Sequence, residues 1–437
     1  MARTVSVFAL VCFFTFNLSG PVAWAADEGQ KKDTEKTDYK AGSGSDEEND
    51  SSQVDDSDEL EKLRQEAGLA IDQAEKGSDS ELPELDPNTV FSSGNRALQA
   101  LNPEASVVVD AGGRLKITDF NTDTLGDDSQ FYFRVLGLHF QANLDPFSFF
   151  KAAIEFHVGE VELGEAYATW TNVLPGLNLT LGKFRQQFGV IQRWHAHSLD
   201  QFDFPLAITT LLGPDGLNQI GVSIEWIAPA LWADDQRLVL QVTNSSNDHL
   251  FNGQQFGVPA ALLHWSQYFD LSDSTYMEFG LTGMLGTNNK RNLLDYNGAR
   301  QDEPWRTTTL GGADLTLSWA PLHNERYKHL TWRSEFYWVG KETDGGYLAA
   351  GGGYSYVDAG LSETLAIGVR GDLTQPYAVD NDGQWIWQAV AYLTWWESPW
   401  VKTRFQFAHK DGDNLLPEDL FIVQVVFAAG PHKHDRY

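Results

Sequence analysis

The stretch Trp385-Ile-Trp-Gln-Ala-Val-Ala-Tyr-Leu-Thr-Trp395 alternates strictly between two sets of side chains. One set is entirely apolar and runs unbroken through Trp385, Trp387, Ala389, Ala391, Leu393 and Trp395. Successive side chains of a β-strand point to opposite faces of its sheet, so this run predicts a strand with one continuous apolar face. The fold class depends on whether the rest of the chain repeats this pattern.

Three further stretches repeat the alternation and carry charges on the second face. Their apolar faces include Trp332, Ile367 and Phe405. The charges lie well inside each strand on the opposite face: Arg333 and Glu335, Arg370 and Asp372, and Lys402 and Arg404. Lipid on one side of the sheet and water on the other accounts for both faces at once. We therefore expect these six side chains to line a water-filled pore.

About sixteen alternating segments lie between residues 105 and 428. No stretch beyond the N-terminal segment approaches the roughly 20 apolar residues that a membrane helix needs. Closure into a barrel removes the edge strands that an open sheet would have to protect. The predicted fold class is all-β, a transmembrane antiparallel β-barrel of about 16 strands over residues 97–430. An even strand number puts both ends of the barrel in the periplasm.

The first 25 residues have the pattern of a cleaved signal peptide. Arg3 gives the positive start, an apolar run extends from Val5 to Leu18, and Ala23-Trp-Ala25 fits the small-x-small cleavage rule. Cys12 is the only cysteine of the chain and lies inside this segment. Cleavage would therefore leave neither disulfide nor thiol chemistry.

The composition changes twice between the signal peptide and the barrel. Residues 26–57 are polar, acidic and Gly/Ser-rich, and are predicted to be disordered because they cannot bury enough apolar surface. Residues 58–76 carry apolar side chains at spacings of three and four, which predicts a short periplasmic helix. This helix is either a coiled coil, which trimerises the protein or contacts peptidoglycan, or a solvated linker helix. Residues 431–437 form a predicted periplasmic tail that contains histidines.

The charge balance restricts the partners. The chain has a formal net charge of −30, and the residues from Pro87 onward contain 40 acidic and 23 basic side chains, a net of −17. Nucleic acid is excluded as a partner, because binding to it requires a basic surface. In a pore, the acidic balance favours weak or cationic selectivity.

The longest break between predicted strands, residues 186–216, follows the fifth of them. This loop begins on the extracellular side, and in a wide barrel such a loop folds into the lumen and narrows it. The side chains expected at the constriction are Lys183, Arg185, Arg193, His195, His197, Asp200 and Asp203. Lys183 and Arg185 share a face with Leu181, so they point into the pore only if Gly182 carries a bulge or the strand has left the bilayer. The alternative is an extracellular loop with surface charges.

His195 and His197 are also weak candidates for metal ligands, because residues i and i+2 of an extended chain face the same side. Two ligands do not make a site, since Zn²⁺ normally takes three or four. Ser198 beside His197 and Asp200 supplies the residue types of a hydrolase, but the members of a catalytic triad normally converge from distant parts of a fold. We expect neither a cofactor nor enzymatic activity.

Several short motifs lie at the entry to the first predicted strand, in the fifth strand and the loop that follows it, and near the C-terminus. They are Ala97–Glu104 with Val107–Asp110, Gly182–Arg185, Phe188-Gly189, Arg193–His195, Phe204–Leu206, Gly213–Leu217, Leu393–Trp395 and Ser398-Pro399. Together these motifs resemble outer-membrane barrels related to the phosphate-selective porins O and P, over residues 97–427. The resemblance implies a porin barrel with a ladder of Arg and Lys in its lumen.

Two features depart from that family. The predicted inward faces mix Arg333 with Glu335 and Arg370 with Asp372, which argues against phosphate selectivity. The terminal strand of the family ends on an aromatic residue, whereas ten residues follow Phe427 here.

The leading functional prediction is an outer-membrane porin for passive diffusion of small hydrophilic solutes or ions, surrounded by lipid and assembled as a homotrimer by analogy with barrels of this size. One alternative is a receptor-transporter for a metal or a chelate, a class that uses about 22 strands and a folded plug. The other is a structural barrel that tethers the outer membrane to the cell wall.

Overall fold

The computed structural model describes residues 103–117, 129–251, 258–294, 300–322, 328–343 and 345–430. The predicted signal peptide, the acidic segment, the 58–76 helix and the 431–437 tail lie outside these residues. No helix in the described ranges has the length and hydropathy of a membrane span.

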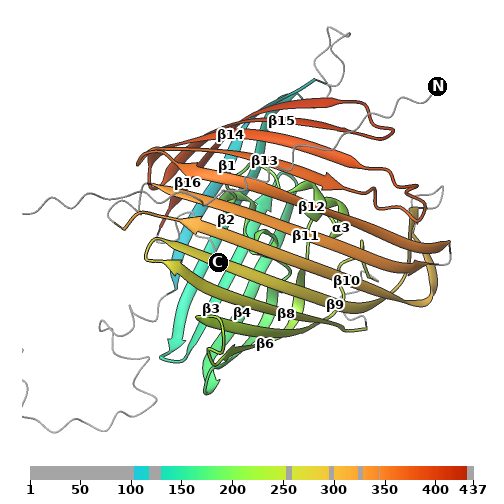
Figure 1. The fold of residues 1–437 in the computed structure, drawn as a ribbon, viewed down its shortest axis with the longest axis horizontal. Coiled ribbons are helices and arrows are strands. Elements are labelled where there is room, and N and C mark those ends of the chain that lie inside the picture. The colour runs from blue at the N-terminus through green and yellow to red at the C-terminus, as the bar shows by residue number, and fades with distance from the viewer. Residues whose placement is uncertain are drawn as a thin grey trace, which may run out of the picture. The chain divides into compact units, whose positions relative to one another are not determined.

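The described part of the chain forms sixteen antiparallel strands (Figure 1). Their bounds are β1 Glu104–Ile117, β2 Gln130–Asp145, β3 Ser148–His157, β4 Glu160–Leu174, β5 Leu177–Arg185, β6 Asn218–Ala228, β7 Asp235–Thr243, β8 Ala260–Ser272, β9 Thr275–Leu294, β10 Arg300–Trp319, β11 His329–Thr343, β12 Gly346–Gly360, β13 Leu365–Thr374, β14 Ile386–Ser398, β15 Val401–Gly412 and β16 Glu418–Ala429.

Each strand pairs with its neighbours in sequence, and β1 closes the sheet by pairing with β16. In that closing pair Val109 lies opposite Phe427. Closure pairs both edges of the sheet, which is how a barrel satisfies its backbone in a bilayer. The predicted class and strand number are confirmed.

The two faces of the strands have the predicted orientation. On β14, Trp387, Leu393 and Trp395 point outward and are exposed, whereas Val390 and Tyr392 point inward and are buried. Residues 385–395 thus give β14 an outer face that is apolar along its whole length. Such a face is stable against hydrocarbon and not against water.

The interior is not uniformly polar. A cluster of buried apolar side chains joins the inward faces of β8 to β12 to the segments that follow β5 and β7. Wall residues of this cluster include Leu262, Met284, Val339 and Tyr356. Part of the lumen is therefore a packed core.

Candidate functional site

The segment between β5 and β6 lies inside the barrel. It contains two short 3₁₀ turns, η1 Ile191–Arg193 and η2 Ala196–Ser198, and one helix, α3 Leu206–Leu211. We call residues 186–217 the inner loop. Most of its side chains are buried, and it is hydrogen-bonded both to nearby strands and to β11–β15, whose residues lie 145 to 205 positions away in sequence.

The apolar side of the inner loop packs on β8 to β12. The Phe188 ring stacks on Tyr337 with ring centroids 5.7 Å apart, and Ile191, Leu199 and Leu211 are fully buried in the same cluster. Burying a side chain of this size contributes about 1.5–3 kcal/mol. The inner loop is thus held in place by the hydrophobic core that it shares with β8 to β12.

Charged wall residues bind the backbone of the inner loop at its first turn. The backbone N–H groups of Val190 and Ile191 donate to Glu335 Oε1 at 3.1 and 3.0 Å. The Arg333 guanidinium lies over the Trp194 ring, 4.7 Å from its centroid. These contacts join β11 to the start of the loop.

The middle of the loop is bound in the same way by β13 and β15. Arg370 donates to the backbone oxygen and the carboxylate of Asp203, at 2.8 and 3.0 Å. Arg404 donates to the backbone oxygens of Leu199 and Gln201, at 2.7 and 2.8 Å. Lys402 donates to the backbone oxygen of His197 at 2.7 Å.

The six charged strand residues that were expected to line a pore lie on the inward face of the barrel and are buried there. None of them is more than 7% exposed: Arg333, Glu335, Arg370, Asp372, Lys402 and Arg404. They bind polar groups of the inner loop, other residues of the barrel wall such as Thr316, or each other. The physical reason is that a buried charge is retained only when hydrogen bonds and opposite charges compensate it.

His195 lies between two carboxylates of the wall. Its Nδ1 is 3.2 Å from Glu155 Oε1 on β3, and its Nε2 is 3.1 Å from Glu165 Oε2 on β4. Burial lowers the pKa of His195, but hydrogen bonding to Glu155 and Glu165 outweighs it and leaves the pKa raised. With a carboxylate at each ring nitrogen, the imidazolium is the favoured form.

This arrangement disfavours metal binding by His195. A metal ligand needs a ring nitrogen without a proton, and both nitrogens of His195 face carboxylates. The rings of His139 and His197 lie close by, with centroids 5.1 and 5.5 Å from that of His195. Among the described residues no group of three or more His, Cys, Asp or Glu is placed to hold a metal ion.

The raised pKa of His195 predicts a pH dependence of stability. The charged triad stabilises the fold fully below the ordinary histidine pKa of 6.5, and this contribution is lost as pH rises through the raised pKa. We expect the apparent Tm of the detergent-folded protein to fall by a few degrees between pH 6 and an alkaline pH. His195→Gln should remove most of this decline. An equal decline in both proteins would contradict the prediction.

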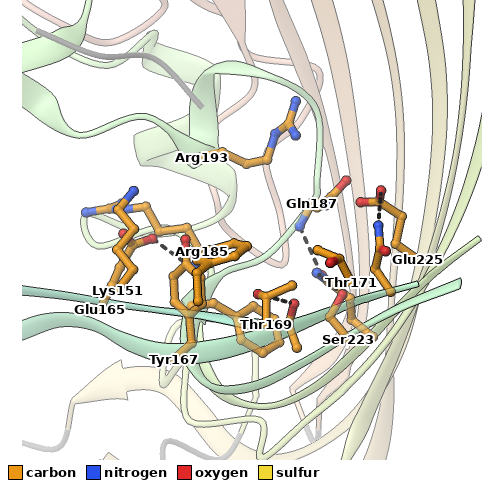
Figure 2. Close-up of a pocket in the computed structure, with 15 residues that line it drawn as sticks. Lys151, Glu165, Tyr167, Thr169, Thr171, Arg185, Gln187, Arg193, Ser223 and Glu225 are labelled. Carbon is orange, nitrogen blue, oxygen red and sulfur yellow. Dashed lines mark hydrogen bonds between the residues drawn. The ribbon is translucent and has the colours of Figure 1, made fainter. Parts of the chain in front are cut away.

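A cavity of the lumen lies against the opposite wall, β3 to β7. A cavity of ≈ 310 Å³ is lined there by Phe149, Lys151, Glu165, Tyr167, Thr169, Thr171, Asn178, Thr180, Phe184, Arg185, Gln187, Arg193, Ser223, Glu225 and Gln241. Figure 2 shows Lys151, Glu165 and Arg185 gathered on one side of this cavity and Glu225 on the other. We call it the lumenal cavity.

Only two of the predicted constriction residues line the lumenal cavity, Arg185 and Arg193. His195, His197 and Asp200 belong to the inner loop but are nearly fully buried, and Asp203 is bound to Arg370. Sequence reasoning missed most of the lining. The available signal was the polar face of β6, where Ser223 and Glu225 alternate with apolar residues.

Lys183 lies away from the lumenal cavity. The strand pairing runs through Gly182 without a shift, so the bulge needed to turn Lys183 inward is absent from β5. Gly182 instead has φ +137°, and a Cβ there would meet the Ala166 backbone oxygen at 2.2 Å. Lys183 Nζ contacts Glu162 at 3.4 Å and lines a second cavity with residues 213–216. Lys183 is therefore not among the residues that line the lumenal cavity.

Ser198, His197 and Asp200 do not form a hydrolytic triad. Ser198 Oγ is buried without a hydrogen-bond partner among the described residues, and the Asp200 carboxylate accepts from the Tyr356 hydroxyl at 2.9 Å. A nucleophile needs a hydrogen bond to its base, and this arrangement has none.

Solved structures of other proteins have a similar fold. The solved structures of OprB from Pseudomonas putida and of an anion-selective porin from Comamonas acidovorans are both 11% identical to this chain. They cover 76% and 75% of it and 95% and 99% of their own chains, with TM-scores of 0.51 and 0.50. The fold is that of an outer-membrane porin. At this identity the likeness extends to the fold alone.

Comparison of the amino-acid sequence with known proteins finds a partial match. No family model matches the chain. An uncharacterized protein of Aquifex aeolicus (strain VF5) is 31% identical over 121 residues, which are 28% of this chain and 25% of that protein. The chain therefore spans about a quarter of the length of this relative.

Proposed function

We propose that the protein is an outer-membrane porin, which admits small hydrophilic solutes through the lumenal cavity beside the inner loop. One observation carries the proposal: a closed sixteen-stranded barrel combines an apolar outer face with an open, polar cavity along β3 to β7. Barrels of this strand number are wide enough for an aqueous channel. The inner loop then sets the width and the chemistry of that channel.

The motifs shared with relatives of the phosphate-selective porins O and P support kinship at this level. The receptor-transporter alternative is weakened by the strand number, since that class uses about 22 strands. Export through a cleaved signal peptide, assembly as a homotrimer and peptidoglycan contact through residues 58–76 remain predictions.

Single-channel recording of the full-length protein in a planar bilayer tests the proposal. We expect discrete and stable current steps in KCl, together with a reversal potential under a salt gradient that reports the ion preference. Circular dichroism and heat-dependent gel mobility would establish that the barrel is folded. Absence of steps from a folded barrel would overturn the proposal.

A further inference from the structure

The lumenal cavity has an excess of positive charge in an otherwise acidic protein. Lys151 on β3, Arg185 at the end of β5 and Arg193 in η1 line it together with two carboxylates, Glu165 and Glu225. Among the charged residues that line the lumenal cavity, the positive charges therefore exceed the negative charges by one. The acidic balance of the whole chain does not describe this site.

The two carboxylates are already bound by other groups. Glu165 faces the His195 imidazolium, and its Oε1 also accepts from the Arg185 backbone N–H at 3.4 Å. Glu225 accepts from the Asn178 amide at 3.3 Å. Glu165 also interacts electrostatically with Lys151 and Arg185. Both carboxylates are therefore already engaged by groups of the protein.

Arg185 and Arg193 differ from the other lumenal arginines. Arg370 and Arg404 are bound by atoms of the inner loop, as described above. In contrast, Arg185 and Arg193 interact with carboxylates only at longer range, Arg185 with Glu155 and Glu165 and Arg193 with Asp314. The buried Nε of each arginine has no hydrogen-bond partner among the described residues. Buried polar groups are normally hydrogen-bonded, so two arginines that line one cavity and each have an unpartnered Nε indicate an anionic ligand.

The cavity also has an apolar component. The rings of Phe149, Tyr167 and Phe184 line it beside the arginines. Its volume of ≈ 310 Å³ lies at the low end of small-molecule sites, which begin at about 300 Å³. An inorganic anion would leave these rings without contact, whereas an organic body would cover them.

We propose that the lumenal cavity binds small organic carboxylates of single negative charge in transit. This rests on the proposed porin function and names the solute class of the same site. The guanidinium fork of Arg185 or Arg193 matches a carboxylate in bidentate geometry. The rings receive the organic body, and Glu225 on the far side disfavours a second negative charge.

Benzoate and inorganic phosphate are the probes for this test. Millimolar benzoate should reduce or interrupt the KCl current of the wild-type channel, and phosphate at equal concentration should do so much less. In the double variant Arg185→Gln/Arg193→Gln, the half-blocking concentration of benzoate should rise about tenfold or more, since a hydrogen bond to a charged group contributes about 1.5–3 kcal/mol. Arg237→Gln is the matched control, because Arg237 is exposed on β7 and pairs with Asp235.

Saturation-transfer NMR of benzoate with the detergent-folded protein separates the two proposals. Saturation transfer without any current would refute the porin function and leave the binding site standing. A current that benzoate does not affect, together with no saturation transfer, would overturn the site and leave the porin function standing. Equal block by phosphate, or an unchanged half-blocking concentration in the double variant, would also overturn it.

Discussion

Replacing residues 188–212 by a short Gly-Ser linker is expected to raise the single-channel conductance several-fold. The inner loop fills the lumen along β8 to β12 with an apolar core and is bound to the wall by Glu335, Arg370 and Arg404. Without it, the current would pass through the whole cross-section of a sixteen-stranded barrel, which is wide enough for an aqueous channel. Bilayer recording measures the change directly.

The barrel itself should survive this replacement, because all sixteen strands and their backbone pairing lie outside the exchanged segment. An exchange of residues 413–417, the exposed connection between β15 and β16, for a linker of equal length is the control and should leave the conductance unchanged. A loop-replaced barrel that folds and conducts no more than the wild type would show that the inner loop does not limit the pore.

Leu181→Arg is expected to prevent stable insertion of the barrel, whereas Thr180→Arg should be tolerated. The two residues are neighbours in the middle of β5. Leu181 is exposed on the outer face, and Thr180 lines the lumenal cavity. An arginine on the lipid face near the bilayer midplane costs about 2–4 kcal/mol, while one in the lumen remains hydrated. Folding into vesicles, followed by urea unfolding, measures both variants.

This pair of variants tests the orientation of β5, because adjacent side chains of a strand point to opposite faces of the sheet. A tolerated Leu181→Arg with a destabilising Thr180→Arg would reverse the assignment of lipid and lumen on β5. Equal and small effects in both variants would mean that β5 does not face hydrocarbon.

The strands could be predicted from the sequence because their signal is local. Alternation along β11, β13, β14 and β15 is set by each strand's own residues, and it correctly placed Arg333, Arg370 and Arg404 on the inward face. What these charges bind is not local. Glu335 accepts from Val190, 145 residues away, and nothing in the spacing of either segment indicates that contact.

The site was predicted only in part for the same reason. The loop that enters the lumen was expected from its length, but which wall it covers depends on the apolar side chains of β8 to β12. Because that wall is covered, the open cavity lies along β3 to β7. Lys151, Tyr167 and Glu225 therefore line it, although each looks like an ordinary polar position in its own strand.

Cysteine accessibility during current recording tests the position of the pathway most directly. Cys12 is the only native cysteine, so a Cys12→Ser background makes each introduced thiol unique. Thr180→Cys places a thiol in the lumenal cavity, and Ala350→Cys places one on the inward face of β12 in the packed cluster. An anionic methanethiosulfonate reagent should lower the current of Thr180→Cys in discrete steps and leave Ala350→Cys unchanged. Modification of Ala350→Cys with no effect on Thr180→Cys would contradict a pathway along β3 to β7.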